Sequence, residues 1–229
     1  MLEDARSAGT LAFMSKNSRR ATSSEPPGRT SGWQGFSLIE LLIVVAISMI
    51  AVAMAMPLVS SAVNQVHLSS SATDYANLLQ LARMRAVQSD TFYYIRTGTV
   101  SGDPVAYVDL NGNSKWDTGE PMVVFAPGVT YKAQSAGPGL SNLKSQFLPA
   151  GATAQNSLQT TDPAFGPRGL PCVVSGSACP YLNAGKPVSY LLFIQNTQDG
   201  RWEAVTLNPA ARIREWAYDV KSATWSPRN

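Results

Sequence analysis

The sequence is poor in the residues that enzymes and metal sites most often use. It contains two cysteines and a single histidine, His67, in 229 residues. One histidine and one pair of thiols do not favour a structural zinc site, which takes four ligands. No pattern pairs a nucleophile with a base, and no glycine-rich loop links a strand to a helix in the way that phosphate sites require. We therefore expect no enzyme, no metal and no cofactor.

Charge of either sign is also scarce, at 14% of the residues, with a net charge of +3. The first 35 residues hold five basic and three acidic side chains, which leaves 13 basic and 12 acidic residues in the remainder. Because that remainder is nearly neutral, its bulk charge gives no argument for nucleic-acid binding.

One stretch lacks charge almost entirely. Residues 36–56 include a single charged side chain, Glu40. At roughly 1.5 Å per residue, a helix of this length matches a bilayer core of about 30 Å, and a carboxylate near its start is costly enough to indicate a role. The basic residues Lys16, Arg19, Arg20 and Arg29 precede this stretch, so the positive-inside rule places the N-terminus in the cytoplasm.

A cleaved secretory signal peptide is the alternative interpretation of this N-terminal pattern. The apolar run is longer than an h-region of about 7–15 residues, it contains Glu40, and the helical pattern continues through Pro57, all of which disfavour cleavage behind the run. Residues 1–33 are polar and have no apolar period, so they read as a disordered leader in which Met14 is a second candidate start.

Beyond Pro57 the helical pattern becomes amphipathic. Apolar residues recur three and four positions apart, at Val59, Val63 and Val66 and then at Tyr75, Leu78, Leu79, Ala82 and Ala86. We predict one helix over residues 37–89, kinked at Pro57 because proline removes a backbone hydrogen bond, with its second half packed on a sheet.

After residue 90 the pattern changes to that of strands. Short runs rich in Val, Tyr and Phe are separated by turn residues, and Asp199-Gly200 between two apolar runs is a strong hairpin signal. We expect residues 133–164 to be loop with at most a strand near 143–148. The predicted strands are 91–96, 105–109, 122–125, 129–132, 188–196, 201–207 and 211–218. The predicted fold class is α+β: a long N-terminal helix, transmembrane and then amphipathic, packed on an antiparallel β domain.

The two cysteines, Cys172 and Cys179, lie seven positions apart in a segment rich in Gly, Pro and Ser. In a compartment that permits oxidation they can close a short loop, and the topology above places them in such a compartment. We predict a disulfide; two free thiols in a cytosolic loop are the alternative.

The apolar stretch begins with Gly35-Phe36-Ser37-Leu38-Ile39-Glu40-Leu41-Leu42-Ile43-Val44, which resembles the processing motif of type IV prepilins. The resemblance implies that a prepilin peptidase removes residues 1–35 and that the new N-terminal Phe36 is methylated. Glu40 and Pro57 then become the fifth and twenty-second residues of the mature chain, and Phe36, Glu40 and Pro57 serve assembly with other pilins. Residues 36–57 would span a bacterial inner membrane once, residues 58–90 would form the amphipathic half of the helix, and 91–229 a periplasmic β domain.

The remainder is similar to a narrower branch, the GspH/FimT pseudopilins, through four looser patterns. These are Leu81-Ala82-Arg83 with Ala86-Val87, residues 107–113 through Gly119-Glu120, residues 165–169, and residues 204–207 leading to 212–214. The leader departs from the family in its length and in Gln34, which stands where a basic residue is common. The resemblance implies a structural minor pseudopilin of a type II secretion system or a type IV pilus, whose partners are a prepilin peptidase, other pilins and the inner membrane.

One acidic segment follows the spacing of a calcium loop. Asp109, Asn111, Asn113, Asp117 and Glu120 take positions 1, 3, 5, 9 and 12 of that pattern. Ser114 replaces the usual glycine, and the flanking segments read as strands instead of helices. An Asx-rich turn between strands is therefore favoured over calcium.

A second weak pattern is Ala211-Arg212-Ile213-Arg214. FimT-type proteins of DNA-uptake pili carry Gly-Arg-x-Arg near the C-terminus, and Ala211 stands in place of that glycine. Arg212 and Arg214 could bind phosphates and Trp216 could stack on a base, although two solvated arginines are the favoured interpretation. The alternatives to a structural subunit are therefore a DNA-binding minor pilin and a membrane-anchored ligand-binding domain unrelated to filaments.

Overall fold

The computed structural model describes residues 35–148, 157–159 and 162–228. The expected leader therefore lies outside the described residues, except for Gly35 at its end. By their internal contacts the described residues form two compact units, one that ends at Ser48 and one that begins at Met49.

Helix α1 (Leu38–Gln88) contains 51 residues and confirms the helix predicted over 37–89. The side chains of residues 35–60 are all exposed, and the helix includes Pro57 without ending there. By length and hydropathy α1 is the one candidate membrane span among the described residues. The sequence thus places an exposed apolar surface on the first part of a helix that elsewhere enters a core.

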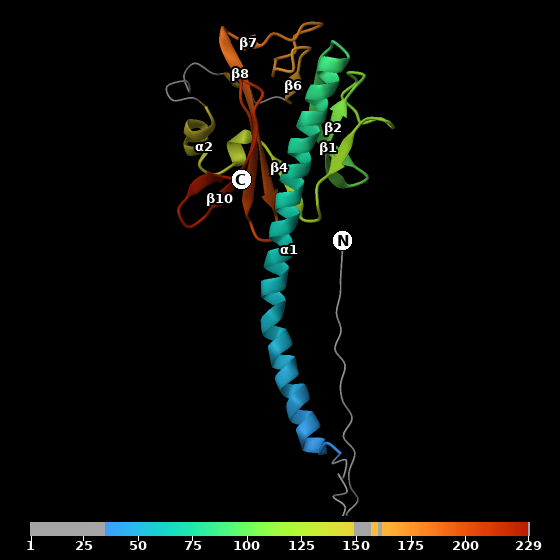
Figure 1. Ribbon diagram of the computed structural model, residues 1–229, viewed down its shortest axis with the longest axis vertical. Helices are drawn as coiled ribbons and strands as arrows, with labels where there is room; N and C mark the ends of the chain where they lie inside the picture. Colours follow the sequence, from blue (N-terminus) through green and yellow to red (C-terminus); the bar gives the residue numbers. More distant parts are fainter. Residues whose placement is uncertain (1–34, 149–156, 160–161, 229) are drawn as a thin grey trace, which may run out of the picture. The chain divides into compact units, whose positions relative to one another are not determined.

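From Leu68 onward, α1 buries one face in the β domain. Its buried residues recur at helical spacing: Leu68, Ser71, Ala72, Tyr75, Ala76, Leu78, Leu79, Ala82 and Ala86. Small residues at 72, 76, 82 and 86 let the helix approach the strands closely, while Tyr75 and Leu79 fill the space between them. Figure 1 shows this part of α1 lying across the strands.

The strands form two sheets. The first has the order β3-β2-β1-β6, and the second has the order β11-β10-β9-β8-β4, with β5 and β7 also pairing β8. Their bounds are β1 Tyr93–Val100, β2 Asp103–Asp109, β3 Met122–Val124, β4 Val129–Lys132, β5 Ser157–Gln159, β6 Ala164–Phe165, β7 Leu182–Asn183, β8 Lys186–Asn196, β9 Trp202–Leu207, β10 Ile213–Asp219 and β11 Thr224–Pro227. All the pairings are antiparallel except β5 with β8, so the predicted antiparallel β domain is confirmed with one parallel addition.

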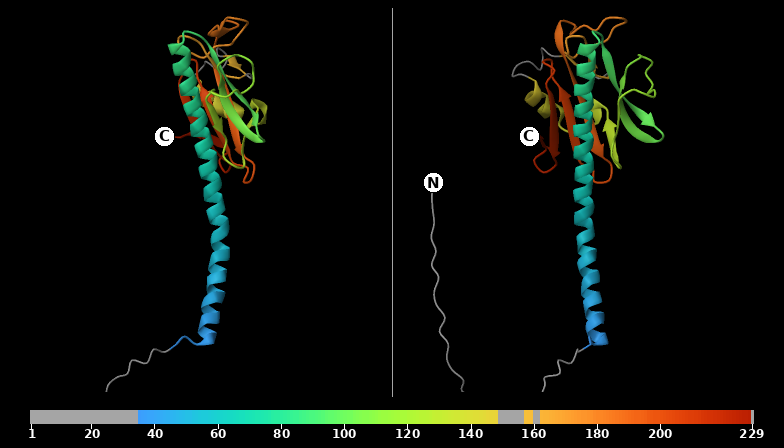
Figure 2. Two further views of the ribbon diagram at one scale, coloured as in Figure 1. Left: turned by 90° about the vertical axis from the view of Figure 1, so that its right-hand side faces the viewer. Right: turned by 45° about the vertical axis from the view of Figure 1, so that its right-hand side comes forward.

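The second sheet has a core on each of its faces. Along β8 the side chains alternate, so Val188, Tyr190 and Ile194 face the core that contains α1, whereas Leu191 and Phe193 face a second core. That second core is covered by helix α2 (Leu140–Phe147) and closed by Trp216 and Trp225. A short 3-10 helix, η1 (Gln134–Ala136), precedes α2. The left view in Figure 2 shows α1 on one side of the strands and α2 on the other.

Two expectations for this region were wrong. The strand suggested near 143–148 is helix α2, because Leu143 and Phe147 lie four residues apart and both face the second core. Strand β11 was missed because only one of its residues, Trp225, is buried, so its pattern has no apolar period.

The predicted hairpin is confirmed. Asn196 and Arg201 close the turn between β8 and β9 by a backbone hydrogen bond of 3.0 Å from Asn196 N–H to Arg201 C=O. Gly200 has φ +70°, the left-handed conformation that glycine adopts without a steric penalty.

Candidate functional site

The first unit presents the start of α1 to solvent. A Cβ added at Gly35 would meet no atom of the described residues within 4 Å, and Phe36 is 80% exposed. The carbonyl of Ser37 accepts from the backbone N–H of Leu41 at 3.1 Å, which is the first full turn of α1. The Gly35–Phe36 peptide bond therefore lies just outside the helix, where an extended backbone can enter a peptidase site.

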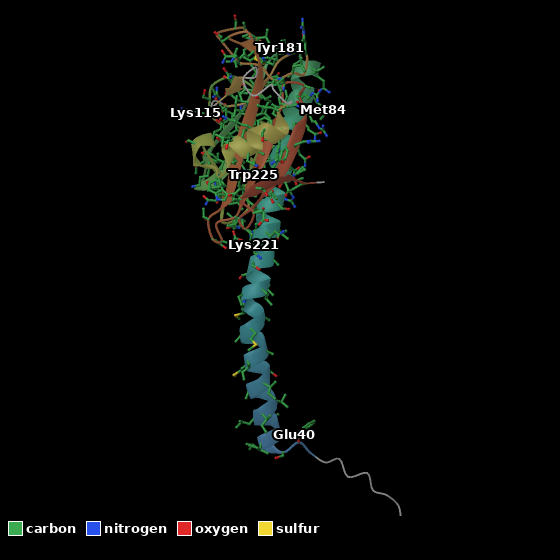
Figure 3. The ribbon with its side chains drawn as sticks, turned by 90° about the vertical axis from the view of Figure 1, so that its left-hand side faces the viewer. Glu40, Met84, Lys115, Tyr181, Lys221 and Trp225 are labelled. Carbon is green, nitrogen blue, oxygen red and sulfur yellow. A yellow bond between two sulfur atoms is a disulfide. The ribbon has the colours of Figure 1, made fainter. Side chains whose placement is uncertain are left out.

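Glu40 lies in the first turn of α1, labelled in Figure 3, where the helix dipole favours a carboxylate. It is the one ionisable side chain in residues 35–48. No cation among this unit's described residues can pair with it, and an unpaired carboxylate is costly in an apolar medium.

Pro57 lies inside α1, where its ring removes one backbone donor. Two hydroxyls next in the chain bond to helix carbonyls: Ser60 donates to Pro57 C=O at 3.1 Å, and Ser61 donates to Leu58 C=O at 3.0 Å. A shallow, almost wholly apolar groove runs beside the proline, lined by Val52, Met56 and Val59. This surface has the chemistry of a helix–helix contact.

Residues 34–56 match the family model described as the prokaryotic N-terminal methylation motif. The match covers Gly35, Phe36 and Glu40 and ends just before Pro57. Over these residues the chain is similar to type IV pilin-like proteins.

A curated relative shares this similarity. The chain is 32% identical over 88 residues to the pilin-like protein PilA1 of Thermus thermophilus, an alignment that covers 38% of this chain and 55% of PilA1. The chain thus spans about half the length of the relative it matches. No solved structure matches the chain significantly.

The arginines of the C-terminal pattern lie together at the start of β10. Arg212 is exposed, Arg214 is half-buried, and both line two pockets, one of about 190 Å³ beside the end of α2 and one of about 550 Å³ beside Thr73 of α1. Neither guanidinium has a hydrogen-bond or ion-pair partner among the described residues. Gln146 and Asn208 add neutral polar groups to the smaller pocket.

The residue before these arginines has an unusual backbone. Ala211 has φ +59°, the left-handed region that glycine occupies most readily. Its carbonyl accepts from Arg83 Nη1 of α1 at 3.4 Å, and Asn208 Oδ1 accepts from the N–H of Arg212 at 2.8 Å. A tight turn fixed to α1 therefore sets where β10 begins.

The expected stacking of Trp216 on a base is wrong. Trp216 is 1% exposed and donates from Nε1 to Thr206 Oγ1 at 2.8 Å within the second core. The strand alternation that brings Arg214 to the α2 side of the sheet also places Trp216 beneath α2. Glu215 lies on the opposite face, where it accepts from Thr73 Oγ1 at 2.8 Å.

The acidic segment between β2 and β3 uses its oxygens internally. Both carboxylate oxygens of Asp109 accept backbone N–H groups, from Gly112 and Ser114, and Oδ2 also pairs with Arg96 Nε at 2.7 Å. Glu120 accepts from the N–H groups of Leu110 and Asp117. The loop therefore has the bonding of an Asx-rich turn.

The amides of the same loop complete that bonding. Asn111 and Asn113 both donate to Asp117 Oδ2, and these hydrogen bonds hold the pKa of Asp117 below its usual range. Among the described residues, no three His, Cys, Asp or Glu side chains are placed to hold a metal ion together.

The two cysteines form a disulfide with a Cα–Cα distance of 5.3 Å. Cys172 is fully buried, and its carbonyl accepts from the Tyr190 hydroxyl, while residues 175–178 form an exposed turn. The disulfide thus joins an exposed loop to the core around β8.

Sequence reasoning missed one polar group of the β domain. Arg96 bridges the buried Asp109 and the half-buried Asp162, with 3.1 Å between its Nη1 and Asp162 Oδ2. The two aspartates lie 53 positions apart, so spacing gave no signal. The alternation of β1, which turns Ile95 inward and Arg96 toward β2, follows only from the pairing of Arg96 with Tyr107.

Proposed function

We propose that the chain is a structural subunit of a pilin-type filament, a minor pseudopilin of the GspH/FimT kind that serves a type II secretion system or a type IV pilus. The observation that carries the proposal is the continuity of α1. One helix begins at the methylation motif, exposes an apolar surface over residues 36–60, and continues as the central core element of a β domain.

The proposal assigns α1 two successive environments. Before assembly, residues 36–57 would store the subunit in the inner membrane with the N-terminus in the cytoplasm and the β domain in the periplasm. The disulfide supports an oxidising compartment for the β domain. During assembly, the same apolar surface would leave the lipid and pack against the helices of other pilins.

Glu40 would direct that assembly. Cleavage after Gly35 creates an amine at Phe36, and this amine on one subunit would neutralise the Glu40 carboxylate of its neighbour in the apolar bundle. Leaving either charge unpaired in such a medium costs several kcal/mol, on the order of the penalty for breaking a buried ion pair. Filament register is therefore fixed by a charge pair, as a buried polar group fixes register in coiled coils.

Processing provides the first test. We expect a prepilin peptidase to shorten the chain by residues 1–35, detected by mass spectrometry, and Gly35→Val to block cleavage because a branched side chain hinders approach to the scissile bond. Ser37→Ala, two positions away, is the matched control and should be cleaved normally. Cleavage behind residue 56 instead would refute the proposal and restore the signal-peptide interpretation.

Incorporation provides the second test. Glu40→Ala should reduce the subunit's recovery in filaments at least tenfold while the membrane-bound pool persists, and Glu40→Asp should retain part of the function. Normal incorporation of Glu40→Ala would refute the charge pair without refuting processing, which separates the two claims.

DNA binding is a second candidate function. The observation that favours it is the surface formed by Arg212 and Arg214, called the arginine face below. Arg212 and Arg214 lack partners among the described residues and border two pockets, so they are available to phosphates.

The test is salt-dependent binding of DNA by the full chain in detergent. Arg212→Ala/Arg214→Ala should abolish it, whereas Lys186→Ala/Lys221→Ala, an equal loss of charge from exposed positions, should not. Equal loss in both variants would identify the binding as bulk attraction.

A further inference from the structure

A crevice of about 230 Å³ opens in the second unit where α1, β1, β4 and β8 meet. The residues used below are Tyr75 of α1, Thr97 of β1, Lys132 at the end of β4, Asp162, Pro163 and Leu192 of β8. None of them belongs to the processing motif, the exposed apolar surface or the arginine face. The crevice is therefore independent of the function proposed above.

The crevice contains a buried hydroxyl without a partner. Tyr75 is 1% exposed, and its Oη has no hydrogen bond among the described residues. Burial, and to a smaller degree the nearby Asp162 carboxylate, raise the pKa of Tyr75, so the phenol stays protonated and acts as a donor. An unpaired buried hydroxyl is destabilising, so this donor, which has no acceptor among the described residues, favours the entry of a molecule that supplies one.

Asp162 supplies the complementary acceptor. Its Oδ2 accepts from Arg96 Nη1 at 3.1 Å, and no described residue donates to its Oδ1. The side chain is 35% exposed, so a molecule in the crevice can reach it. A protonated phenol and a carboxylate oxygen thus border the same space.

The remaining walls select against other groups. Leu192 and Pro163 are apolar, which suits the methylene part of a side chain, and the half-buried Lys132 adds a cation. A carboxylate entering here would meet the Asp162 charge, and an aliphatic group would leave the Tyr75 hydroxyl unpaired. A carboxamide satisfies both, since its C=O accepts from Tyr75 and its NH₂ donates to Asp162.

Two strands that contribute to the crevice also have incomplete pairing. β4 is the last strand of its sheet. β6 covers β1 at Tyr93 and Tyr94, and Ile95 N–H donates to Pro163 C=O at 2.8 Å, so β1 beyond Ile95 pairs with β2 alone among the described residues. Free backbone N–H and C=O groups at such edges recognise extended polypeptide.

We propose that this crevice binds the carboxamide side chain of an asparagine or glutamine carried on an extended segment of another polypeptide. The side chain enters toward Tyr75, and the backbone of the segment pairs with the edge of β1 or β4. The shape is that of a single anchoring pocket beside a strand edge, which gives specificity through one side chain and affinity through the backbone.

The test uses the full chain in detergent micelles and three capped tripeptides, acetyl-Ala-Gln-Ala-amide and its Glu and Leu counterparts. Binding is followed by NMR through the Tyr75 ring and the backbone amides of Thr97 and Lys132. The Gln peptide should give saturable shifts at these positions, and the Glu and Leu peptides should bind about fivefold more weakly or worse, because each leaves one polar partner unsatisfied.

Tyr75→Phe provides the decisive variant because its two expected effects have opposite signs. It should raise the Tm of the free protein by removing an unpaired buried hydroxyl, and it should weaken the Gln peptide about fivefold. Tyr190→Phe is the matched control: its hydroxyl already donates to Cys172 C=O, so its loss should lower the Tm and leave peptide affinity unchanged.

Three results would overturn the proposal. One is the absence of saturable shifts with the Gln peptide, the second is equal binding of the Leu peptide, and the third is an ordered water that bridges Tyr75 and Asp162 and is not displaced by the peptide. Self-association of the chain that competes with the Gln peptide would instead support the proposal and identify the partner as a second copy.

Discussion

The two parts of α1 differ in how far their side chains are buried and in whether their polar groups have partners. Over residues 35–60 every side chain is exposed, and the carboxylate of Glu40 has no partner in its own unit. From Leu68 to Ala86 the helix is embedded, and even its buried Ser71 has both a donor and an acceptor role fulfilled. The first part therefore contributes no buried side chain to the core, whereas the second part is an element of that core.

The largest expected contrast lies between two leucines of the same helix. Leu79→Ala should reduce the free energy of unfolding of the β domain by about 2–5 kcal/mol, because Leu79 is 1% exposed and the lost side chain leaves a cavity. Leu42→Ala, at a position 57% exposed, should change it by less than about 0.5 kcal/mol. Urea unfolding followed by tryptophan fluorescence measures both, and equal effects would refute the division of α1.

Two serines offer a smaller contrast. Ser71 Oγ donates to His67 C=O at 2.8 Å and accepts from Ala126 N–H at 2.9 Å, so Ser71→Ala leaves a backbone donor unpaired and should cost about 1–3 kcal/mol. Ser61 also donates to a helix carbonyl but has no contact of this kind with the β domain. Thermal unfolding of Ser61→Ala should match that of the wild type. If Ser61→Ala lowered the Tm as much as Ser71→Ala, the hydrogen bond to the helix carbonyl, and not the bond to Ala126, would be the stabilising one.

The contact between α1 and the chain's end should depend on pH. Arg228 donates to Glu203 Oε1 at 2.7 Å and to Ser69 Oγ of α1 at 3.0 Å. Burial nevertheless raises the pKa of Glu203 in the folded protein. The stability that this raised pKa contributes is complete below the pKa of Glu203 in the unfolded chain, about 4.3, and is lost as the pH rises through the pKa in the folded protein. Wild type should therefore gain stability relative to Glu203→Gln as pH falls from about 7 to about 5. A difference that shrinks or stays level over urea titrations at these pH values would contradict this.

The smallest effect is expected from calcium. The carboxylates of Asp109 and Glu120 are bonded to backbone N–H groups, in contrast to Glu40, so adding calcium should move the Tm by less than about 1 °C. A rise that saturates with calcium, and that Asp109→Asn abolishes, would show that the loop reorganises around a cation.

Composition and periodicity predicted α1, the hairpin at Gly200 and the α+β class because each rests on local rules. The length of an apolar run, a stripe at 3.6-residue spacing and an Asp-Gly turn do not depend on distant residues. The motif at Gly35, Phe36 and Glu40 is equally local, which is why the sequence alone carried the family resemblance.

The misses all depend on contacts between distant segments. Trp216 looked available for stacking until Thr206 and α2 were seen to enclose it. Leu143 and Phe147 formed too short a run to separate helix from strand without the facing Trp225. The crevice at Tyr75 needs α1, β1 and β8 together, and no spacing in the sequence announces it.

Ala211 limits how this surface can diverge. A methyl group held at φ +59° is tolerated, glycine would relieve strain there, and a β-branched residue would add to it. The backbone torsion of Ala211, and not the side chains of Arg212 and Arg214, therefore determines where this arginine pair lies. Related sequences could exchange Arg212 and Arg214 for neutral or acidic residues without shifting β10. The charge of this surface can therefore evolve separately from its shape.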